Sequence, residues 1–332
     1  MQFSATGLVR NASIAALLLA TSALCCRAAT CTSQAELSAQ ERTVLAAAAG
    51  QLLAEVVAQD ESGLQGALLP SEASAWEGMR GALEGSAPLL KGGQAQLRSL
   101  YLLDASGAAG PADTQFFCSN AGGSLNVTIT LRALPPGRYG LILADAAGSA
   151  QAAQVGLILA WDSGAVAWKL AGLFIRQGAF DGHDGVWYWE HGRELAKGDP
   201  WAAWYSYEAA RYLLLPVDFV SSPNLEKLLQ EQSQIQGSPQ ADLPLSLRSG
   251  DRAWKVDSVT LDPTLHEPDL GIAYESSGVT DPAAVRTEAI SVLSAFLKAK
   301  PGLRANFHGL WAYAVRDGKK TAVMELPMAQ IP

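Results

Sequence analysis

Residues 185–212 read GVWYWEHGRELAKGDPWAAWYSYEAARY and hold eight aromatic residues in 28 positions. This density indicates either an aromatic binding site or the interior of a helical hairpin. Gly198-Asp199-Pro200 divides the stretch, because Gly and Asp favour turns and Pro fits the first turn of a helix. We therefore expect one helix from Val186 to Lys197 and a second from Pro200 to Leu214, ended by Pro216.

The aromatic residues are spread around both expected helices. Trp201, Trp204 and Tyr205 share one face of the second helix, whereas Tyr207 lies near the opposite face. Because a helix that is apolar on more than one side is usually buried nearly all round, the pattern favours a hairpin that forms the shared core of two neighbouring domains. The alternative is an open groove that binds a protein, peptide or glycan through large rigid rings. The candidate binding residues are then Trp187, Trp189, Trp201, Trp204 and Tyr205.

The small residues of this stretch have a regular placement. Gly192 would lie at a close helix crossing, Gly198-Asp199 at the turn, and Ala203 and Ala210 in the second helix. This arrangement resembles a tetratricopeptide-type helical hairpin, although the turn is one residue short and bulky aromatics replace small residues. A single hairpin of this kind cannot bury its own faces, so we expect it to dock on neighbouring domains. A third helix from Ser222-Pro223 to about Gln234 would complete the segment 183–236.

The N-terminus has the features of a secretory signal peptide. Arg10 precedes an apolar core, Ile14 to Leu24, which is shorter than a membrane-spanning helix. Small residues around Ala28 suit a signal peptidase, so we expect residues 1–28 to be removed. The Ala-rich and Gly-rich composition with few Lys is typical of a GC-rich bacterium. The sequence therefore predicts an exported protein that is periplasmic or extracellular.

Removal of the signal peptide leaves two cysteines, Cys31 and Cys118. In an oxidising compartment two such thiols usually pair, so we predict a disulfide, with two unrelated buried thiols as the alternative. Removal also lowers Lys plus Arg from 24 to 22 against 32 Asp plus Glu, which gives a mature charge of −10. This acidic balance argues against nucleic acid as a partner. No further apolar stretch is long enough to predict a transmembrane segment in the mature chain.

Residues 31–180 begin with helical patterns and end with strand patterns. Apolar positions recur at helical spacing from Glu41 to Ala58, and a shorter helix is expected from Glu72 to Leu83 with Ser71 as its cap. Four strands then follow with turn-forming residues between them, which predicts an antiparallel meander. The expected strands cover residues 125–131, 139–144, 155–161 and 168–175.

The order of these elements, closed by the strand Trp168-Lys-Leu-Ala-Gly-Leu-Phe174, resembles the NTF2-like superfamily. The resemblance implies helices packed inside a curved, cone-shaped sheet, in a family of binding and scaffold domains with a few enzymes. The enzymes use an Asp, His or Tyr in the cone, but residues 31–182 contain no His, and Asp104 and Asp145 adjoin turns. An open polar pocket with a buried Asp near Tyr101 or Tyr139 would favour an enzyme. An enclosed dry cavity would favour a ligand carrier, and a filled cone a scaffold.

The C-terminal sequence follows a polar segment at 237–249, which we interpret as a linker. Two strands (254–261 and 270–274), a helix that begins at Asp281-Pro282 and two further strands (309–315 and 321–326) predict a small ββαββ domain over residues 250–332. Asp317-Gly318 is a strong hairpin signal. The predicted class is α+β: helices on a curved antiparallel sheet, then a helical hairpin, then this ββαββ domain.

Motifs of known chemistry do not occur in the sequence. It has no HExxH, CxxC pair, GxSxG or Walker loop. Two histidine groups, His183-Asp184 with His191 and His266-Glu267 with Asp269, lack recognised metal-ligand spacing. We expect His308 to be a hydrogen-bonded structural residue and Arg316 and Lys319 to be solubilising charges.

These observations predict no catalytic residue, cofactor or metal. The expected function is an exported, non-catalytic binding or assembly module of the bacterial cell envelope. The alternative is an enzyme or small-ligand carrier that uses the cone cavity of the NTF2-like domain.

Overall fold

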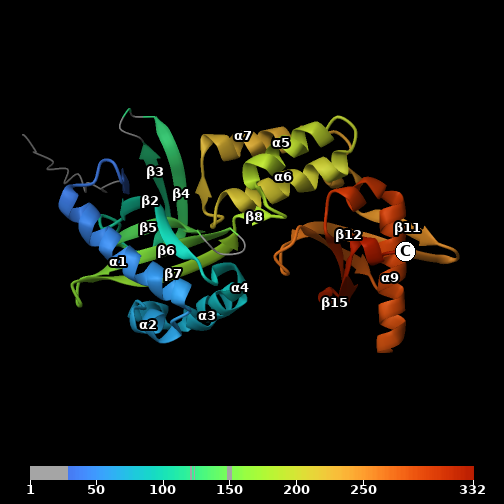
Figure 1. Cartoon of the computed structure of the whole chain (residues 1–332), viewed down its shortest axis with the longest axis horizontal. Coiled ribbons are helices and arrows are strands. Elements are labelled where there is room, and N and C mark those ends of the chain that lie inside the picture. Colours follow the sequence, from blue (N-terminus) through green and yellow to red (C-terminus); the bar gives the residue numbers. More distant parts are fainter. Residues whose placement is uncertain (1–28, 120–121, 123, 148–151) are drawn as a thin grey trace, which may run out of the picture.

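The computed structural model describes residues 29–119, 122, 124–147 and 152–332, so the predicted signal peptide, residues 1–28, lies outside the described residues. The described chain forms three regions in a row: an N-terminal region (30–184), a helical region (185–242) and a C-terminal region (245–332) (Figure 1). The structure has the mixed α+β class, with mostly antiparallel sheets. Among the described residues, no helix has both the length and the apolar character needed to span a membrane.

The N-terminal region is built on a five-stranded antiparallel sheet of order β1-β2-β5-β6-β7. Its strands are β1 Thr30–Ser33, β2 Gln94–Asp104, β5 Arg138–Ala147, β6 Ala153–Asp162 and β7 Ala167–Gln177. Apolar side chains of the helices pack on one face of this sheet, with Leu45, Leu52 and Leu83 in the same buried cluster as Leu157 and Leu170. The helices are α1 Ala39–Ala58, α2 Glu61–Gly66, η1 Pro70–Ala75, α3 Trp76–Gly85 and α4 Ala87–Leu90.

A second, three-stranded sheet covers the other face of the first one. It has the order β10-β4-β3, with β3 Ala112–Ser119, β4 Leu125–Leu134 and β10 Val220–Ser221. Phe116 and Ile129 of this sheet share a buried cluster with Leu141 and Leu143 of β5. The prediction that residues 125–131 begin the meander was therefore wrong, since β4 belongs to the second sheet and the meander of the main sheet begins with β5 and continues through β6 and β7.

The predicted disulfide is present: Cys31 of β1 and Cys118 of β3 are bonded at an S–S distance of 2.05 Å. The bond joins the two sheets of the N-terminal region, because β1 belongs to the first sheet and β3 to the second.

The second predicted helix was wrong in its start. Residues 70–75 form the 3-10 helix η1, and the α-helix begins only at Trp76. Ser71 caps no backbone group, because its hydroxyl donates to Glu72 Oε1 instead.

The helical region begins after a short hairpin of β8 Ala179–Phe180 and β9 His183–Asp184. The predicted helices are α5 Gly185–Leu195, α6 Pro200–Leu214 and α7 Pro223–Ser233. Asp184, Asp199 and Ser222 cap them by accepting hydrogen bonds from backbone N–H groups. Gly192 lies against α6, since a Cβ at this position would be 2.9 Å from Tyr207 Cδ2.

The C-terminal region is a five-stranded sheet of order β11-β12-β13-β14-β15. The strands are β11 Leu245–Ser249, β12 Arg252–Asp262, β13 Asp269–Glu275, β14 Gly309–Arg316 and β15 Lys319–Pro327. The central pair β13–β14 is parallel and is connected through α9 Pro282–Ala299 and η2 Pro301–Ala305, and η3 Met328–Gln330 follows the last strand. The linker prediction for 237–249 was wrong: α8 Pro239–Asp242 lies there, and β11 adds a fifth strand to the expected four.

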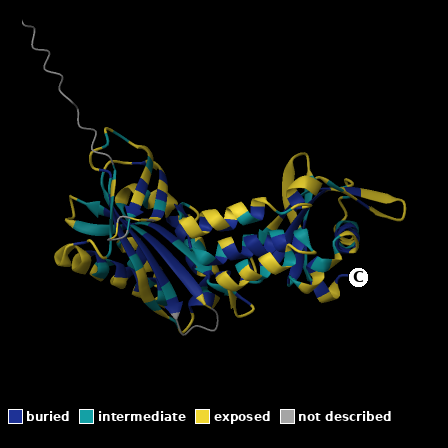
Figure 2. Cartoon of the chain, turned by 90° about the horizontal axis from the view of Figure 1, so that it is seen from above, coloured by how far each residue is buried: buried dark blue, intermediate teal, exposed yellow. Residues whose placement is uncertain are grey.

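Helix α6 contributes to two cores. Trp201 and Tyr205 are buried in the core of the C-terminal region, whereas Tyr207 and Leu213 pack in a separate cluster with Phe180 and α7. Figure 2 shows this helix buried along much of its length between its neighbours. The packing of α6 agrees with the interpretation of the hairpin as a shared core, whereas α5 exposes Val186 and Trp187.

Candidate functional site

The five aromatic residues proposed as a binding site are not on one open surface. Trp201 is 2 % exposed and Tyr205 is 1 % exposed. The Trp201 indole N–H donates to Asp242 Oδ2 at 2.8 Å, and the Tyr205 hydroxyl donates to Val259 O at 3.1 Å. Because the Trp201 ring is covered and its indole N–H is paired inside the core, Trp201 does not lie on an open groove, and the groove alternative was wrong for this residue.

The other three candidates have different surroundings. Trp187 is 37 % exposed, with its ring stacked between His183 at 3.8 Å and His191 at 4.6 Å. Trp189 is half-buried; its indole N–H donates to Glu231, and the Arg193 guanidinium lies over its ring. The two rings thus contact different groups: two histidines in the case of Trp187, and Glu231 with Arg193 in the case of Trp189.

Trp204 and Tyr205 line a cavity of about 530 Å³ between α6 and β12. Two of its polar side chains have partners within the chain: Glu208 accepts from Gln232, and the Tyr212 hydroxyl donates to Gln177.

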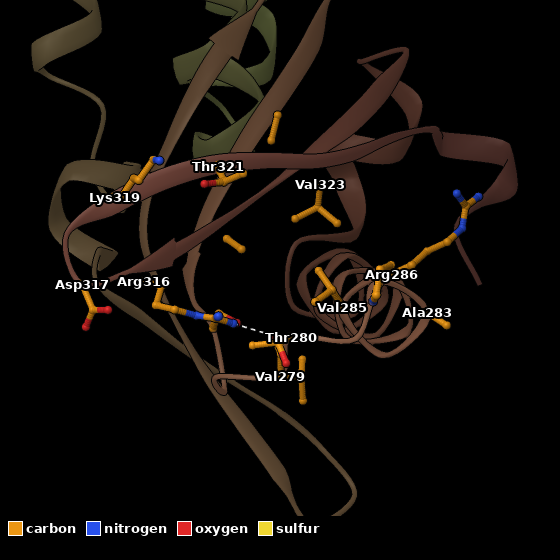
Figure 3. Close-up of a pocket in the computed structure, with 14 residues that line it drawn as sticks. Val279, Thr280, Ala283, Val285, Arg286, Arg316, Asp317, Lys319, Thr321 and Val323 are labelled. Atoms are coloured by element: carbon orange, nitrogen blue, oxygen red, sulfur yellow. Dashed lines mark hydrogen bonds between the residues drawn. The ribbon is translucent and has the colours of Figure 1, made fainter.

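A larger cavity of about 980 Å³ lies in the C-terminal region, between the N-terminal end of α9 and the β14–β15 hairpin. Figure 3 shows Val285 of α9 and Val323 of β15 on opposite sides of the space, with Thr280 at its lower edge. The remaining lining is mostly small or aliphatic, so most of the wall is apolar. It comprises Ser276, Val279, Pro282, Ala283, Ala314, Thr321 and Ala322, besides the charged residues.

The charged residues around this cavity are mainly cationic: Arg286, Arg316 and Lys319, against Asp317. The Arg316 side chain reaches across the cavity toward Val279 and Thr280 and donates to the Val279 carbonyl (Figure 3). A guanidinium has five N–H donors, so it can also bind an acidic group. From the sequence, Arg316 and Lys319 were expected to be only solubilising charges. Their place in the lining of this cavity was not predicted, because nothing in the sequence places them beside α9.

A second cluster of polar residues lies elsewhere in the same sheet. Asp269 begins β13, His308 precedes β14, and Glu325 lies in β15, and one ligand atom from each falls within 4.8 Å of the other two. Asp269 is completely buried, and its Oδ1 lies 2.9 Å from His308 Nδ1. His308 is thus hydrogen-bonded as expected, but it also belongs to a convergent set of potential ligands.

Burial determines the electrostatics of this cluster. It raises the pKa of both the Asp269 and Glu325 carboxyls, and the charge of Asp269 raises that of Glu325 further. Burial alone would lower the pKa of His308, but the hydrogen bond and charge of Asp269 outweigh it and raise this pKa. The cluster therefore holds more negative charge than its surroundings stabilise.

The two histidine groups considered from the sequence do not form such a set. His183 and His191 are separated by the Trp187 ring. His266 instead contacts Gly85 O at 3.2 Å, a residue of the N-terminal region. The set of Asp269, His308 and Glu325 has no signal in the sequence, because its members lie in β13, just before β14 and in β15, and the pairing of these strands is set by the fold.

No protein-family model matches the chain, and no curated protein or solved structure matches it either.

Proposed function

We propose that this protein is an exported, non-catalytic binding module of the bacterial cell envelope. The C-terminal region binds the ligand, in the cavity between α9 and the β14–β15 hairpin. The N-terminal region, which resembles NTF2-like scaffolds, and the helical region support it. The observation that carries the proposal is the combination of an apolar wall with Arg316 in one cavity.

The chemistry of the cavity favours a ligand with an aliphatic part and an acidic group. Val285 and Val323 offer apolar surface, while Arg316 can form charge-assisted hydrogen bonds to a carboxylate. A peptide or protein segment that ends in an aliphatic residue with a free carboxylate has both features. Such a ligand belongs to the protein and peptide classes that the sequence predicted.

The packing of the N-terminal region favours this scaffold role over a carrier or enzyme with its site in the cone. Buried apolar side chains of α1 and α3 meet those of the sheet, and both Tyr101 and Tyr139 are buried on the opposite face. A hollow of about 380 Å³ lies between α1 and the beginning of β2, lined mainly by Ala and Leu. The arrangement gives a ligand little polar recognition there.

Fluorescence polarisation with labelled peptides tests the proposal. We expect the full chain to bind a pentapeptide that ends in Leu with a free carboxylate. The same peptide with a C-terminal amide should bind about tenfold or more weakly, since it loses one charge-assisted interaction. Arg316→Leu should reduce binding of the acid to the level of the amide.

Arg252→Leu is the matched control. Arg252 is an exposed arginine of β12 outside the lining of the cavity, so this change should leave the affinity as it is. The proposal fails if neither peptide binds, or if acid and amide bind the Arg316→Leu variant and the unchanged chain alike.

A further inference from the structure

Three segments distant in sequence bring Asp269, His308 and Glu325 together. β13 pairs with β14 in parallel, and β14 pairs with β15 so that Trp311 is opposite Glu325. The beginning of β13, the residue before β14 and the second half of β15 therefore meet at one end of the sheet. One nitrogen and two carboxylate oxygens converge there within 4.8 Å of one another.

Two oxygens of this set are buried without a partner. Asp269 Oδ2 and Glu325 Oε1 accept no hydrogen bond from the described residues, although Asp269 is 0 % exposed. The Trp311 indole N–H is near enough to lower the pKa of Asp269 slightly, yet it too lacks an acceptor of good geometry. Buried carboxylate oxygens are normally paired or bound to a metal, so these two unpaired oxygens indicate a site for a cation.

The backbone leaves the space between the carboxylates open at Gly309. A Cβ there would lie 2.4 Å from Glu325 Oε1 and 2.9 Å from Asp269 Oδ1. Any other residue would push a side-chain atom into the place where the two oxygens approach each other. Gly309 thus lets the carboxylates of Asp269 and Glu325 approach each other, although no hydrogen bond joins them.

We propose that Asp269, His308 and Glu325 bind a divalent transition-metal ion, for which Zn²⁺ is the best match. An imidazole nitrogen with two carboxylates suits zinc, whereas calcium and magnesium prefer sites made of oxygen alone. Two carboxylates also balance the charge of the ion. This site is separate from the peptide cavity and does not depend on the proposed binding function.

The exposure of the ligands indicates an open coordination position. The side chain of His308 is 38 % exposed and Glu325 is half-buried, while Asp269 is fully buried. Three protein ligands leave the fourth place of a tetrahedral ion for water or for a ligand group. Trp311 would then orient a carboxylate from outside the coordination sphere, as the outer partners of metal ligands commonly do.

Metal titration of the full chain, purified without a polyhistidine tag and stripped with a chelator, tests the site. Isothermal titration with ZnCl₂ should detect one ion that is bound with micromolar affinity or better. His308→Gln and Glu325→Gln should each weaken this binding about 100-fold or abolish it. CoCl₂ should give the visible absorption bands of a four-coordinate site in the unchanged chain but not in these two variants.

Two controls separate this site from other acids and histidines. Glu267→Gln changes a half-buried acid that is outside the ligand set, and His183→Gln changes an exposed histidine that stacks on Trp187. Both variants should keep the bound ion. Far-UV circular dichroism without metal checks that each variant is folded.

The proposal is overturned if the unchanged chain binds neither Zn²⁺ nor Co²⁺. It is also overturned if folded His308→Gln and Glu325→Gln bind as many ions, with the same affinity, as the unchanged chain. In that case protonation of His308 and Glu325, and not a metal ion, would balance the negative charge of the cluster.

Discussion

Glu288 is a buried carboxylate on α9 whose role can be read from its contacts. It is 3 % exposed and accepts hydrogen bonds from the Trp254 indole, the Ser277 backbone N–H and the Ser276 hydroxyl. Burial alone would raise its pKa, but these hydrogen bonds outweigh burial and lower it. Glu288 therefore ties α9 to β12 and to the segment that follows β13.

Replacement of Glu288 should destabilise the protein. Glu288→Ala leaves the buried indole N–H of Trp254 and the partly buried N–H of Ser277 without an acceptor, so we expect the free energy of unfolding to fall by about 3 kcal/mol. Urea unfolding at pH 7 measures this change. Glu226→Gln, at an exposed acid of α7, should change it by less than about 0.5 kcal/mol. Equal effects of the two changes would contradict this account.

The lowered pKa also sets the pH dependence. Because the folded pKa of Glu288 lies below its ordinary value of 4.5, its stabilising effect is present above pH 4.5 and is lost as the pH falls through the folded value. The difference in unfolding free energy between the unchanged chain and Glu288→Gln should therefore shrink between pH 7 and about pH 3. A difference that stays constant over this range would show that the charge of Glu288 is not involved.

Individual site residues were the least predictable part of the chain. Cys31 and Cys118 could be paired because removal of the predicted signal peptide would leave only these two cysteines. Asp269 and Glu325 are 56 positions apart and carry no shared motif, so only the order of the strands brings them together. Trp201 is of a residue type that is common in binding sites, but the face of α6 on which it lies is covered by the C-terminal region.

At the scale of elements, the crossing of α5 and α6 depends on Gly192. Tyr207, against which a Cβ would collide, is 3 % exposed and is held by its hydroxyl on Glu231. Gly192→Ala gains about 1 kcal/mol of helix propensity, but overpacking costs typically about 1–3 kcal/mol. We therefore expect a net loss of about 1 kcal/mol in the free energy of unfolding, measured in urea.

Gly198→Ala is the control for this prediction. A Cβ at Gly198 meets nothing within 4 Å, and its backbone is not in the left-handed region. This change should be neutral or slightly stabilising. If Gly192→Ala is equally harmless, the two helices do not cross as closely as their contact indicates.

Elements with a clear hydrophobic period were predicted well, and the others were missed. The residues of α1 have such a period, whereas α6 is bounded by Pro200 and Pro216, and the predicted ends of both helices lie within two positions of those observed. β2 was missed because Leu100, Tyr101, Leu102 and Leu103 are buried in succession between two layers, which removes the alternation of a half-exposed strand. β11 was missed because it is short, polar and preceded by Pro244.

At the scale of the whole molecule, the C-terminal region depends on α6. The Trp201 ring lies 5.8 Å from Phe296 and the Tyr205 ring 6.3 Å from Phe307. The fragment 245–332 lacks both aromatic residues, each of which contributes several kcal/mol when buried. We expect this fragment to be unfolded or to melt at least about 15 °C below the fragment 183–332.

Thermal denaturation followed by circular dichroism compares the two fragments. The longer fragment includes α5, α6 and α7 and serves as the control. Equal melting temperatures would mean that the C-terminal sheet and α9 form a sufficient core by themselves, and that α6 joins it as a separate unit.

The parallel pairing of β13 and β14 makes the length of α9 a structural constraint. After β13 the chain must return to the same end of the sheet before β14 can begin, and Leu270 pairs with Leu310. The 18 residues of α9 span about 27 Å at the rise of an α-helix, close to the length of about 26 Å expected for an eight-residue strand. An insertion or deletion of one turn in α9 would move the start of β14 along its neighbour. The reach of this connecting helix therefore matches the distance over which the chain must return to bring the starts of the two central strands side by side.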